Sequence, residues 1–201
     1  MIRSVCTILS FNHENITRRC VESVRRHFAD SEILLIHNGS DPKVVASLAA
    51  AYPDLQHESW LENVGFSGGA NRALNHSFAR AEWVLFLTND TELEVVGTWP
   101  SQPGLYGPRI WRRKTDQIDS LGGEVLWLRG ALAHTRSEFE FHRAQAPYIP
   151  GTAFLLDRQT FARGGAFDET LFTYWEDVDL SLRYTKQGLR LGLQTDWEVR
   201  H

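Results

Sequence analysis

The sequence predicts an α/β protein of the doubly wound type, with a mainly parallel sheet and helices on both of its faces. Short runs that are apolar at every position alternate with longer segments in which apolar residues recur at helical spacing; the runs are Val5–Leu9, Ile33–Ile36 and Trp83–Leu87. A strand that is apolar at every position needs cover on both faces, and helices between successive strands supply that cover.

The first ninety residues contain three such strand–helix units. The run at residues 5–9 precedes a helical face of Thr17, Cys20, Val21, Val24 and Phe28. The second run precedes Asp41-Pro42, which is typical of a helix start, and an alanine-rich segment that Pro53 ends. A third helical face, from Ala70 to Phe78, leads into the run at residues 83–87.

The rest of the chain is less regular. Residues 97–150 have weak periodicity, and we expect short strands such as Leu121–Leu128 joined by long loops. The regular pattern returns with a strand at residues 153–156, a turn at Gly164-Gly165, a helix between Val178 and Leu189, and a last strand near residues 191–194. We therefore expect one domain over residues 1–201, with no second core.

Composition argues against some classes of function and location. The chain has 21 Lys plus Arg against 25 Asp plus Glu, a formal charge of −4, which argues against a nucleic-acid partner. No apolar run approaches the ~20 residues of a transmembrane helix. Cys6 and Cys20 lack the paired spacing of a zinc or redox motif, so a reducing cytoplasm is the expected location.

Polar clusters directly follow three of the predicted strands: Ser10-Phe11-Asn12, His37-Asn38-Gly39-Ser40-Asp41 and Thr88-Asn89-Asp90. The carboxyl ends of parallel strands meet at one rim of the sheet, which is where ligands bind in open α/β sheets. The alternative is that these are ordinary turn residues. Three clusters on one rim favour a binding site.

Asp90 is a candidate metal ligand. It follows a buried strand, and a carboxylate beside a diphosphate is a natural ligand for Mg²⁺ or Mn²⁺. The alternative role for Asp90 is a helix N-cap.

The segment Asn63–Arg72 is rich in glycine and runs into a helix. Such a loop can offer backbone N–H groups to a phosphate, with Arg72 adding positive charge. It does not match G-x-G-x-x-G or the P-loop pattern, and a tight loop packed against the sheet explains the glycines equally well.

Three acids, Glu176, Asp177 and Asp179, crowd the start of a predicted helix beside aromatic residues, which suit a sugar face. Capping explains one acid, and mutual repulsion would raise the pKa of another, as a general base requires. At 3.6 residues per turn, Asp177 and Asp179 flank the buried Val178 at about 100° on opposite sides, so geometry leaves both as candidates. Asp179 is also four residues from Arg183 and can pair with it.

Taken in order, these segments resemble family 2 glycosyltransferases, and most closely the rhamnosyltransferase-like branch. The resemblance rests on Ser10-Phe11-Asn12, Asn38-Gly39-Ser40, Asn63–Arg72, Thr88-Asn89-Asp90, Gly165–Glu169 and Glu176-Asp177-Val178-Asp179. Each piece is weak alone, but the ordered set is specific and covers nearly the whole chain, from Val5 to His201.

The resemblance implies a GT-A fold and an inverting transfer from a nucleotide-diphosphate sugar to an acceptor hydroxyl, in cell-surface polysaccharide or glycan synthesis. It implies a divalent metal, Mg²⁺ or Mn²⁺, and a glycan or lipid-linked acceptor. Residues 1–96 would be the nucleotide-sugar-binding half and residues 97–201 the acceptor-side half. A location in the cytoplasm or at the inner face of the membrane would follow.

The resemblance also implies roles for individual residues. Asp177 is similar to the catalytic base of the family, and Asp90 occupies the position of a metal ligand. His201 matches a histidine that reaches the metal or diphosphate in relatives. The substrate-binding positions are Ser10, Asn12, Asn38, Gly39, Ser40, Asn63, Gly68, Arg72, Asn89, Trp175 and Glu176.

Two other functions compete with this one. A non-catalytic or impaired nucleotide-sugar binder is favoured by His37, which stands where the family usually has an acid, by Thr88, which stands where it usually has Asp or Asn, and by the short C-terminus. A sugar nucleotidyltransferase would carry a glycine-rich loop with basic residues after the first strand, whereas this chain has Ser10-Phe11-Asn12-His13-Glu14-Asn15 there.

Overall fold

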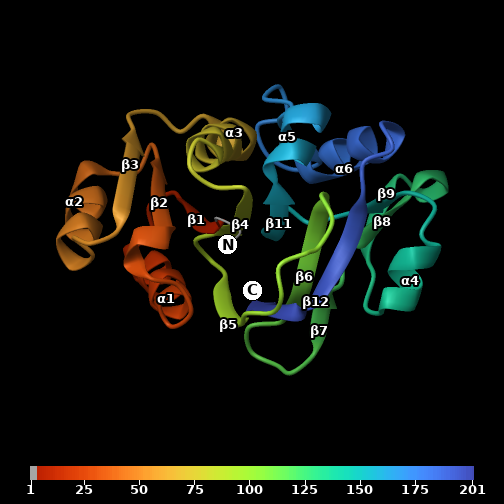
Figure 1. Cartoon of the computed structure of the whole chain (residues 1–201), viewed down its shortest axis with the longest axis horizontal. Coiled ribbons are helices and arrows are strands. Elements are labelled where there is room, and N and C mark those ends of the chain that lie inside the picture. Colours follow the sequence, from red (N-terminus) through yellow and green to blue (C-terminus); the bar gives the residue numbers. More distant parts are fainter. Residues whose placement is uncertain (1–3) are drawn as a thin grey trace.

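A nine-stranded sheet organises the chain in this computed structural model, which describes residues 4–201 (Figure 1). Residues 1–3 of the predicted domain lie outside the described residues. The order is β3-β2-β1-β4-β11-β6-β12-β5, with β7 paired to β6. The first four strands in this order are parallel, as expected: β1 (Ser4–Ser10), β2 (Ile33–Asn38), β3 (Gln56–Trp60) and β4 (Trp83–Thr88).

Helices cover both faces of this parallel half, which confirms the doubly wound prediction. Cys6 and Ile8 of β1 pack with α1 (Glu14–Arg25) and α2 (Pro42–Ala51), whereas Val5 and Leu9 pack with α3 (Gly65–Phe78) on the opposite face. The expected start of α2 is correct, because the Asp41 carboxylate accepts a hydrogen bond of 2.7 Å from the Lys43 N–H. Strand β3 lies at the sheet edge and has no apolar run, so a strand there was not predicted from the sequence.

The second half of the sheet is mixed. Strand β11 (Ala153–Asp157) runs antiparallel to both β4 and β6 (Leu105–Trp111). Strand β12 (Leu191–Arg200) is parallel to β6 and antiparallel to β5 (Glu92–Val95), and β7 (Ile118–Ser120) is antiparallel to β6. The parallel pairs expected from the sequence are therefore found mainly in the first half of the sheet, because β11 is antiparallel to both of its neighbours.

A second, three-stranded sheet lies beside the large one, on the right of Figure 1. It contains β8 (Gly123–Leu126), β9 (Ala131–His134) and β10 (Pro147–Tyr148), with α4 (Glu138–Arg143) between β9 and β10. The strand expected over Leu121–Leu128 is shorter than predicted, because residues 127–129 form a 3₁₀ turn, η2 (Trp127–Arg129), that joins β8 to β9.

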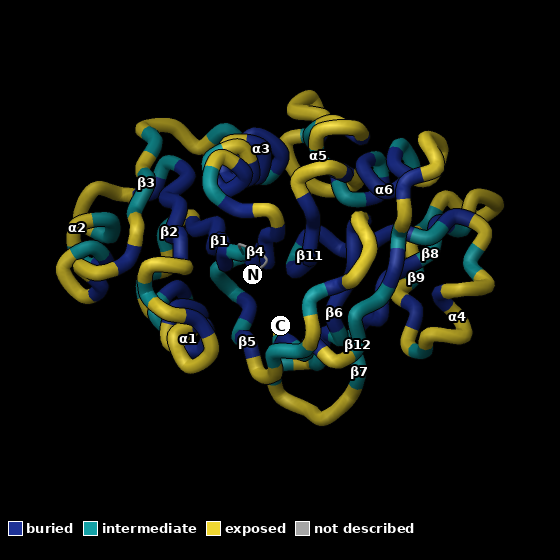
Figure 2. The backbone as a smooth tube through the Cα atoms, in the orientation of Figure 1, coloured by how far each residue is buried: buried dark blue, intermediate teal, exposed yellow. Residues whose placement is uncertain are grey.

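The last two helices complete the cover of the α3 face. Leu180 and Tyr184 of α6 (Glu176–Lys186) share a core with α3 and β11, and α5 (Arg158–Gly164) precedes α6. Figure 2 shows strands β1, β2, β4, β6 and β11 of the large sheet as mostly buried, whereas exposure is concentrated in loops, outer helix faces and the edge strand β3. A short 3₁₀ helix, η1 (Asp30–Glu32), leads into β2. Within residues 4–201, every helix is too short or too polar to cross a membrane.

Candidate active site

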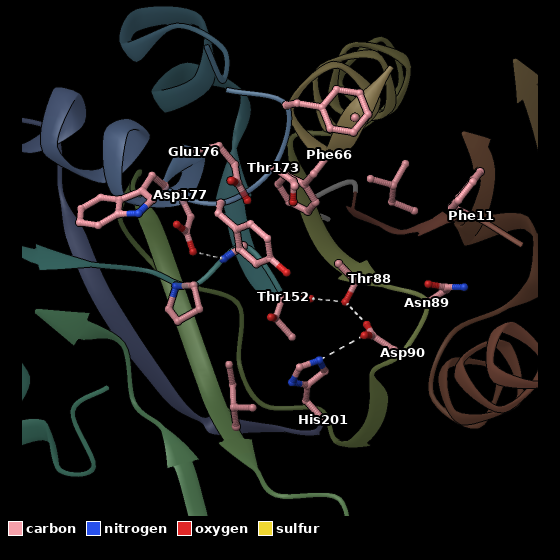
Figure 3. A pocket seen from close by; sticks show the side chains of 18 of the residues that line it. Phe11, Phe66, Thr88, Asn89, Asp90, Thr152, Thr173, Glu176, Asp177 and His201 are labelled. Atoms are coloured by element: carbon pink, nitrogen blue, oxygen red, sulfur yellow. Dashed lines mark hydrogen bonds and ion pairs between the residues drawn. The ribbon is translucent and has the colours of Figure 1, made fainter. Parts of the chain in front are cut away.

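A pocket of about 810 Å³ opens at the carboxyl ends of β1 and β4 (Figure 3). One wall contains residues from all three strand-end clusters that were predicted to share a rim: Ser10, Phe11, Asn38, Thr88, Asn89 and Asp90. The opposite wall contains the segment from Phe172 to Asp177, together with Leu132 and His134 of β9. Nine of the predicted site residues line it: Ser10, Asn38, Asn63, Asn89, Asp90, Trp175, Glu176, Asp177 and His201.

The ends of β1 and β4 are held to α1 by a small hydroxyl–amide network. Thr17 Oγ1 lies 3.1 Å from Ser10 Oγ and accepts a hydrogen bond of 2.8 Å from Asn89 Nδ2. Asn12 and Ser40 lie beside this wall and do not line the pocket: the Asn12 N–H donates to Ser40 Oγ at 2.9 Å, which joins the β1 and β2 loops. These two residues position the loops around the pocket.

The Asn38-Gly39 segment is packed against the loop before α3. Asn38 Nδ2 donates to Asn63 Oδ1 at 3.1 Å and to the Gly65 carbonyl at 2.9 Å. Gly39 has a positive φ of 73°, and a Cβ there would lie 2.1 Å from the Asn63 backbone nitrogen. Only glycine fits this position without displacing the backbone, so Gly39 contributes close packing.

The glycine-rich segment is helical rather than a loop. Helix α3 begins at Gly65, so most of residues 63–72 form its first two turns. A Cβ on Gly69 would lie 2.7 Å from Asn38 Nδ2, so this glycine lets α3 pack closely against the end of β2. One on Gly68 would lie 2.9 Å from Cγ2 of Val64, the residue that caps the same helix. The exposed Arg72 lies 5.4 Å from the Trp60 ring centroid and does not line the pocket.

Asp90 and His201 form a pair at the pocket floor. His201 Nε2 lies 3.2 Å from Asp90 Oδ2, and the Thr88 hydroxyl donates to Asp90 Oδ1 at 2.5 Å (Figure 3). Burial raises the pKa of the Asp90 carboxyl, but the hydrogen bonds from His201 and Thr88 outweigh burial and bring it to about 2. The bond to Asp90 raises the pKa of His201 in turn.

His201 is held by the strands around it. Its N–H donates to the Trp111 carbonyl at 2.9 Å, and its carbonyl accepts a bond of 2.8 Å from the Arg113 N–H. These backbone bonds explain how the residue that follows β12 can hold a fixed side chain in the pocket.

The Asp90–His201 pair fits a divalent cation bound together with a diphosphate. A carboxylate oxygen and an imidazole nitrogen are both suitable ligands, and Mg²⁺ and Mn²⁺ often take their remaining ligands from phosphate and water. Among the described residues, the pocket lining contains four carboxylates and two histidines, with neither Lys nor Arg. A diphosphate would therefore need a cation as a counter-charge.

Asp177 lies across the pocket from this pair, at the start of α6 (Figure 3). Its Oδ2 accepts a hydrogen bond of 2.9 Å from the Gly151 N–H, and its Oδ1 accepts one of 2.8 Å from the Val178 N–H. Burial raises the pKa of the Asp177 carboxyl, against the opposing effect of these bonds. Asp179 makes the expected ion pair with Arg183, at 2.7 Å, and does not line the pocket.

Glu176 is the most buried of the three acids. Its exposed fraction is 7%, and its Oε2 has no hydrogen-bond partner among the described residues. Burial raises the pKa of Glu176 to about 7, with the neighbouring Asp177 charge adding to the effect and a bond from its own N–H opposing it. The predicted repulsion within this cluster therefore falls on Glu176, whereas burial is what raises the pKa of Asp177.

Aromatic side chains frame the entrance above these acids. Phe172, Tyr174 and Trp175 are all exposed and all line the pocket. Tyr174 and Trp175 have positive φ values of 68° and 70°, which are uncommon for residues with side chains. Because strain of this kind persists where the surroundings impose it, the turn is held by its neighbours, including a bond from the Phe66 N–H to the Phe172 carbonyl.

Sequence reasoning missed a second polar pair in the pocket. His134 Nδ1 of β9 lies 3.6 Å from Asp119 Oδ2 of β7, and both residues line the pocket. They come from the weakly patterned middle of the chain, where no motif marks them.

His37 lies beneath the pocket wall. It is fully buried, and its Nε2 lies 3.2 Å from His57 Nδ1 in a stacked pair. Burial lowers the pKa of His37 to about 4, with a further contribution from His57. His37 was expected near the nucleotide because it stands where the family usually has an acid. It does not line the pocket.

Comparisons with known proteins agree with the resemblance. Residues 5–95 match the model of the family described as glycosyl transferase family 2. Two Mycobacterium tuberculosis proteins, from strains CDC 1551 and H37Rv, are 28% identical to this chain over 204 residues, and both are named N-acetylglucosaminyl-diphospho-decaprenol L-rhamnosyltransferase. The match covers 84% of this chain and 66% of each relative, just under two thirds of their length.

Solved structures share the fold along the whole chain. GalNAc-T7, crystallised with UDP, GalNAc and Mn²⁺, superposes with a TM-score of 0.78 at 16% identity, covering 100% of this chain and 43% of that one. The mannosyltransferase PcManGT from Pyrobaculum calidifontis, solved with GDP-Man and Mn²⁺, gives 0.65 at 15% identity over 100% and 56%. At these identities the likeness establishes the fold.

Proposed function

We propose that this chain, whose residues 5–95 match the model of glycosyl transferase family 2 and whose fold is GT-A, transfers a sugar from a nucleotide-diphosphate sugar to an acceptor hydroxyl. The observation that carries the proposal is the placement of the Asp90–His201 pair and the Glu176–Asp177 pair on opposite walls of one pocket. A donor fits between them, with its diphosphate beside the first pair and its sugar toward the second.

On the donor side, Ser10 and Asn89 face the nucleoside, and Asp90 and His201 would hold a divalent cation with the diphosphate. When bound, that cation supplies positive charge against the negative charge that develops on the leaving group. The neighbours solved with Mn²⁺ and with UDP or GDP-Man support both parts of this assignment.

On the acceptor side, Asp177 accepts the proton of the attacking hydroxyl. Its bonds from the Gly151 and Val178 N–H groups fix the direction of the carboxylate, and burial raises its pKa, which increases its basicity. A single displacement by that hydroxyl inverts the anomeric carbon. Glu176 lies next to Asp177 and provides a hydrogen-bonding group for the donor sugar, since its Oε2 is otherwise unpartnered among the described residues.

The acceptor is proposed to be a glycan or a lipid-linked sugar of cell-surface polysaccharide synthesis, reached at the inner face of the membrane. The support is the name of the Mycobacterium tuberculosis relatives, whose acceptor is a sugar diphosphate on decaprenol. That name also makes L-rhamnose the first donor sugar to test, beside sugars linked to UDP and GDP, the two nucleotides found with the structural neighbours.

The experiment is a two-stage assay. Thermal shift with UDP-, TDP- and GDP-sugars, each with and without Mn²⁺, identifies the donor, because a ligand at 100 times its Kd adds about 2.7 kcal/mol to the free energy of unfolding. Turnover of that donor, by hydrolysis or by transfer to a synthetic polyprenyl-diphosphate sugar, then tests catalysis. Binding without any turnover would favour the non-catalytic nucleotide-sugar binder.

Asp177→Asn tests the base directly, with Asp179→Asn as the matched control on the same helix. We expect kcat to fall by at least ~10²-fold in Asp177→Asn while the Kd of the donor changes little, because the amide keeps the shape and loses the basicity. Near-normal turnover in Asp177→Asn, with a large loss in Asp179→Asn, would exchange the two roles.

A further inference from the structure

The β8–β9 hairpin connects the pocket to an exposed apolar turn. Leu132 and His134, two residues apart on β9, line the pocket from the same face of the strand. The hairpin continues away from the pocket to the pair Leu126–Ala131, and the turn Trp127–Gly130 follows. One face of the hairpin therefore changes from a polar residue in the pocket to apolar residues at the turn.

The turn exposes two large apolar side chains to solvent. Trp127 is 63% exposed and Leu128 is 105% exposed, and Leu132 below them is 37% exposed. Residues 125–133 contain a single charged residue, Arg129, which lies within the turn and is also exposed. Adjacent exposed Trp and Leu side chains with one cation differ from the scattered single leucines that ordinary surfaces carry.

We propose that the turn Trp127–Gly130 inserts into the interface of an anionic phospholipid bilayer. Trp prefers the depth of the lipid head groups, Leu128 can reach the acyl boundary, and Arg129 can extend its guanidinium to the lipid phosphates. The exposed area of Trp127 and Leu128 is on the order of 300 Å², well below the ~800 Å² per partner of a stable protein interface. A small apolar tip with one positive charge suits a bilayer surface better than a protein partner.

This inference rests on the proposed function in one respect: it gives the lipid-linked acceptor a route to the pocket. From His134 to the turn the hairpin rises by roughly 10 Å, at about 3.3 Å per residue. A turn seated in the bilayer would hold the pocket that distance above the lipid. The polar head of a lipid-linked acceptor could then reach Asp177 while its hydrocarbon remained in the membrane.

The test is sedimentation of the full chain with vesicles of phosphatidylcholine alone and of phosphatidylcholine with one quarter phosphatidylglycerol. The variant carries Trp127→Ser and Leu128→Ser together. The control is Leu61→Ser, since Leu61 is 102% exposed on a loop outside the hairpin. We expect the unmodified chain and the control to sediment with the anionic vesicles, and the double variant to lose at least ~10-fold in partition coefficient.

Nucleotide binding by calorimetry separates this inference from the proposed function. Retained nucleotide affinity in the double variant, with lost vesicle binding, supports the inference and shows that the fold is intact. Equal vesicle binding by the variant and the unmodified chain would overturn it. It would also be overturned if the chain formed a concentration-dependent dimer that requires Trp127 and Leu128 and does not bind vesicles. The turn would then bind a second copy of the chain. If the unmodified chain did not bind nucleotide, that result would count against the proposed function and not against this inference.

Discussion

Replacing Glu176 with Gln should stabilise the protein in a strongly pH-dependent way. The carboxyl is 7% exposed, its Oε2 has no partner among residues 4–201, and its pKa rises from 4.5 to about 7 on folding. The folded protein therefore binds a proton between these two values that the unfolded chain has already released. Its free energy of unfolding falls as the pH rises through this window.

The magnitude follows from the size of the shift. A change of 2.5 pKa units corresponds to about 3 kcal/mol of destabilisation once the pH is well above 7. The neutral amide of Gln carries no such cost. The free energy of unfolding of Glu176→Gln minus that of the unmodified chain should thus be near its smallest at pH 4.5. It should grow by about 3 kcal/mol toward pH 8.

The assay is urea unfolding of both proteins at half-unit steps from pH 4.5 to 8.5, without nucleotide or metal. Glu82→Gln, at an exposed glutamate beside β4, controls for loss of one negative charge. Groups that titrate equally in both proteins cancel in the difference. A difference in free energy of unfolding that is constant across this range would refute the reasoning. So would a relative stability of the unmodified chain that increases with pH.

Two further predictions concern Asp90 and Gly39. Asp90→Ala should remove the Mn²⁺-dependent part of nucleoside diphosphate affinity, measured by calorimetry with and without Mn²⁺, because it deletes the carboxylate of the Asp90–His201 pair; unchanged metal dependence would contradict the assignment. Gly39→Ala should lower the free energy of unfolding by about 1–3 kcal/mol in urea, since the new Cβ would lie 2.1 Å from the Asn63 nitrogen at a positive φ; a stability equal to that of the unmodified chain would show that the loop yields freely.

The parts of the structure that the sequence predicted are those set by local patterns. Apolar runs placed β1, β2 and β4, and because parallel strands end on one rim, Ser10, Asn38 and Asp90 could be expected at one site. The Asp179–Arg183 ion pair was also predictable, because it depends only on i,i+4 spacing in a helix.

The parts that were missed depend on pairing between distant segments. His134 and Asp119 meet because β9 and β7 belong to short antiparallel pairs, and strands of three or four residues leave almost no periodicity to detect. The glycines of α3 were ambiguous for a related reason. Close packing and phosphate binding both favour glycine, and only the position of Asn38 beside Gly69 shows that packing requires it.

The place of His201 has a consequence for how the pocket is made during synthesis. Asp90 lies at the end of β4, but its partner follows β12, which must insert between β6 and β5. On the ribosome, the parallel half from β1 to β4 emerges more than a hundred residues earlier and can collapse around local contacts. The charged floor of the pocket is thus completed only after residues 191–201 have emerged, and a nascent chain halted before residue 191 would hold an open sheet edge and an Asp90 without its histidine partner.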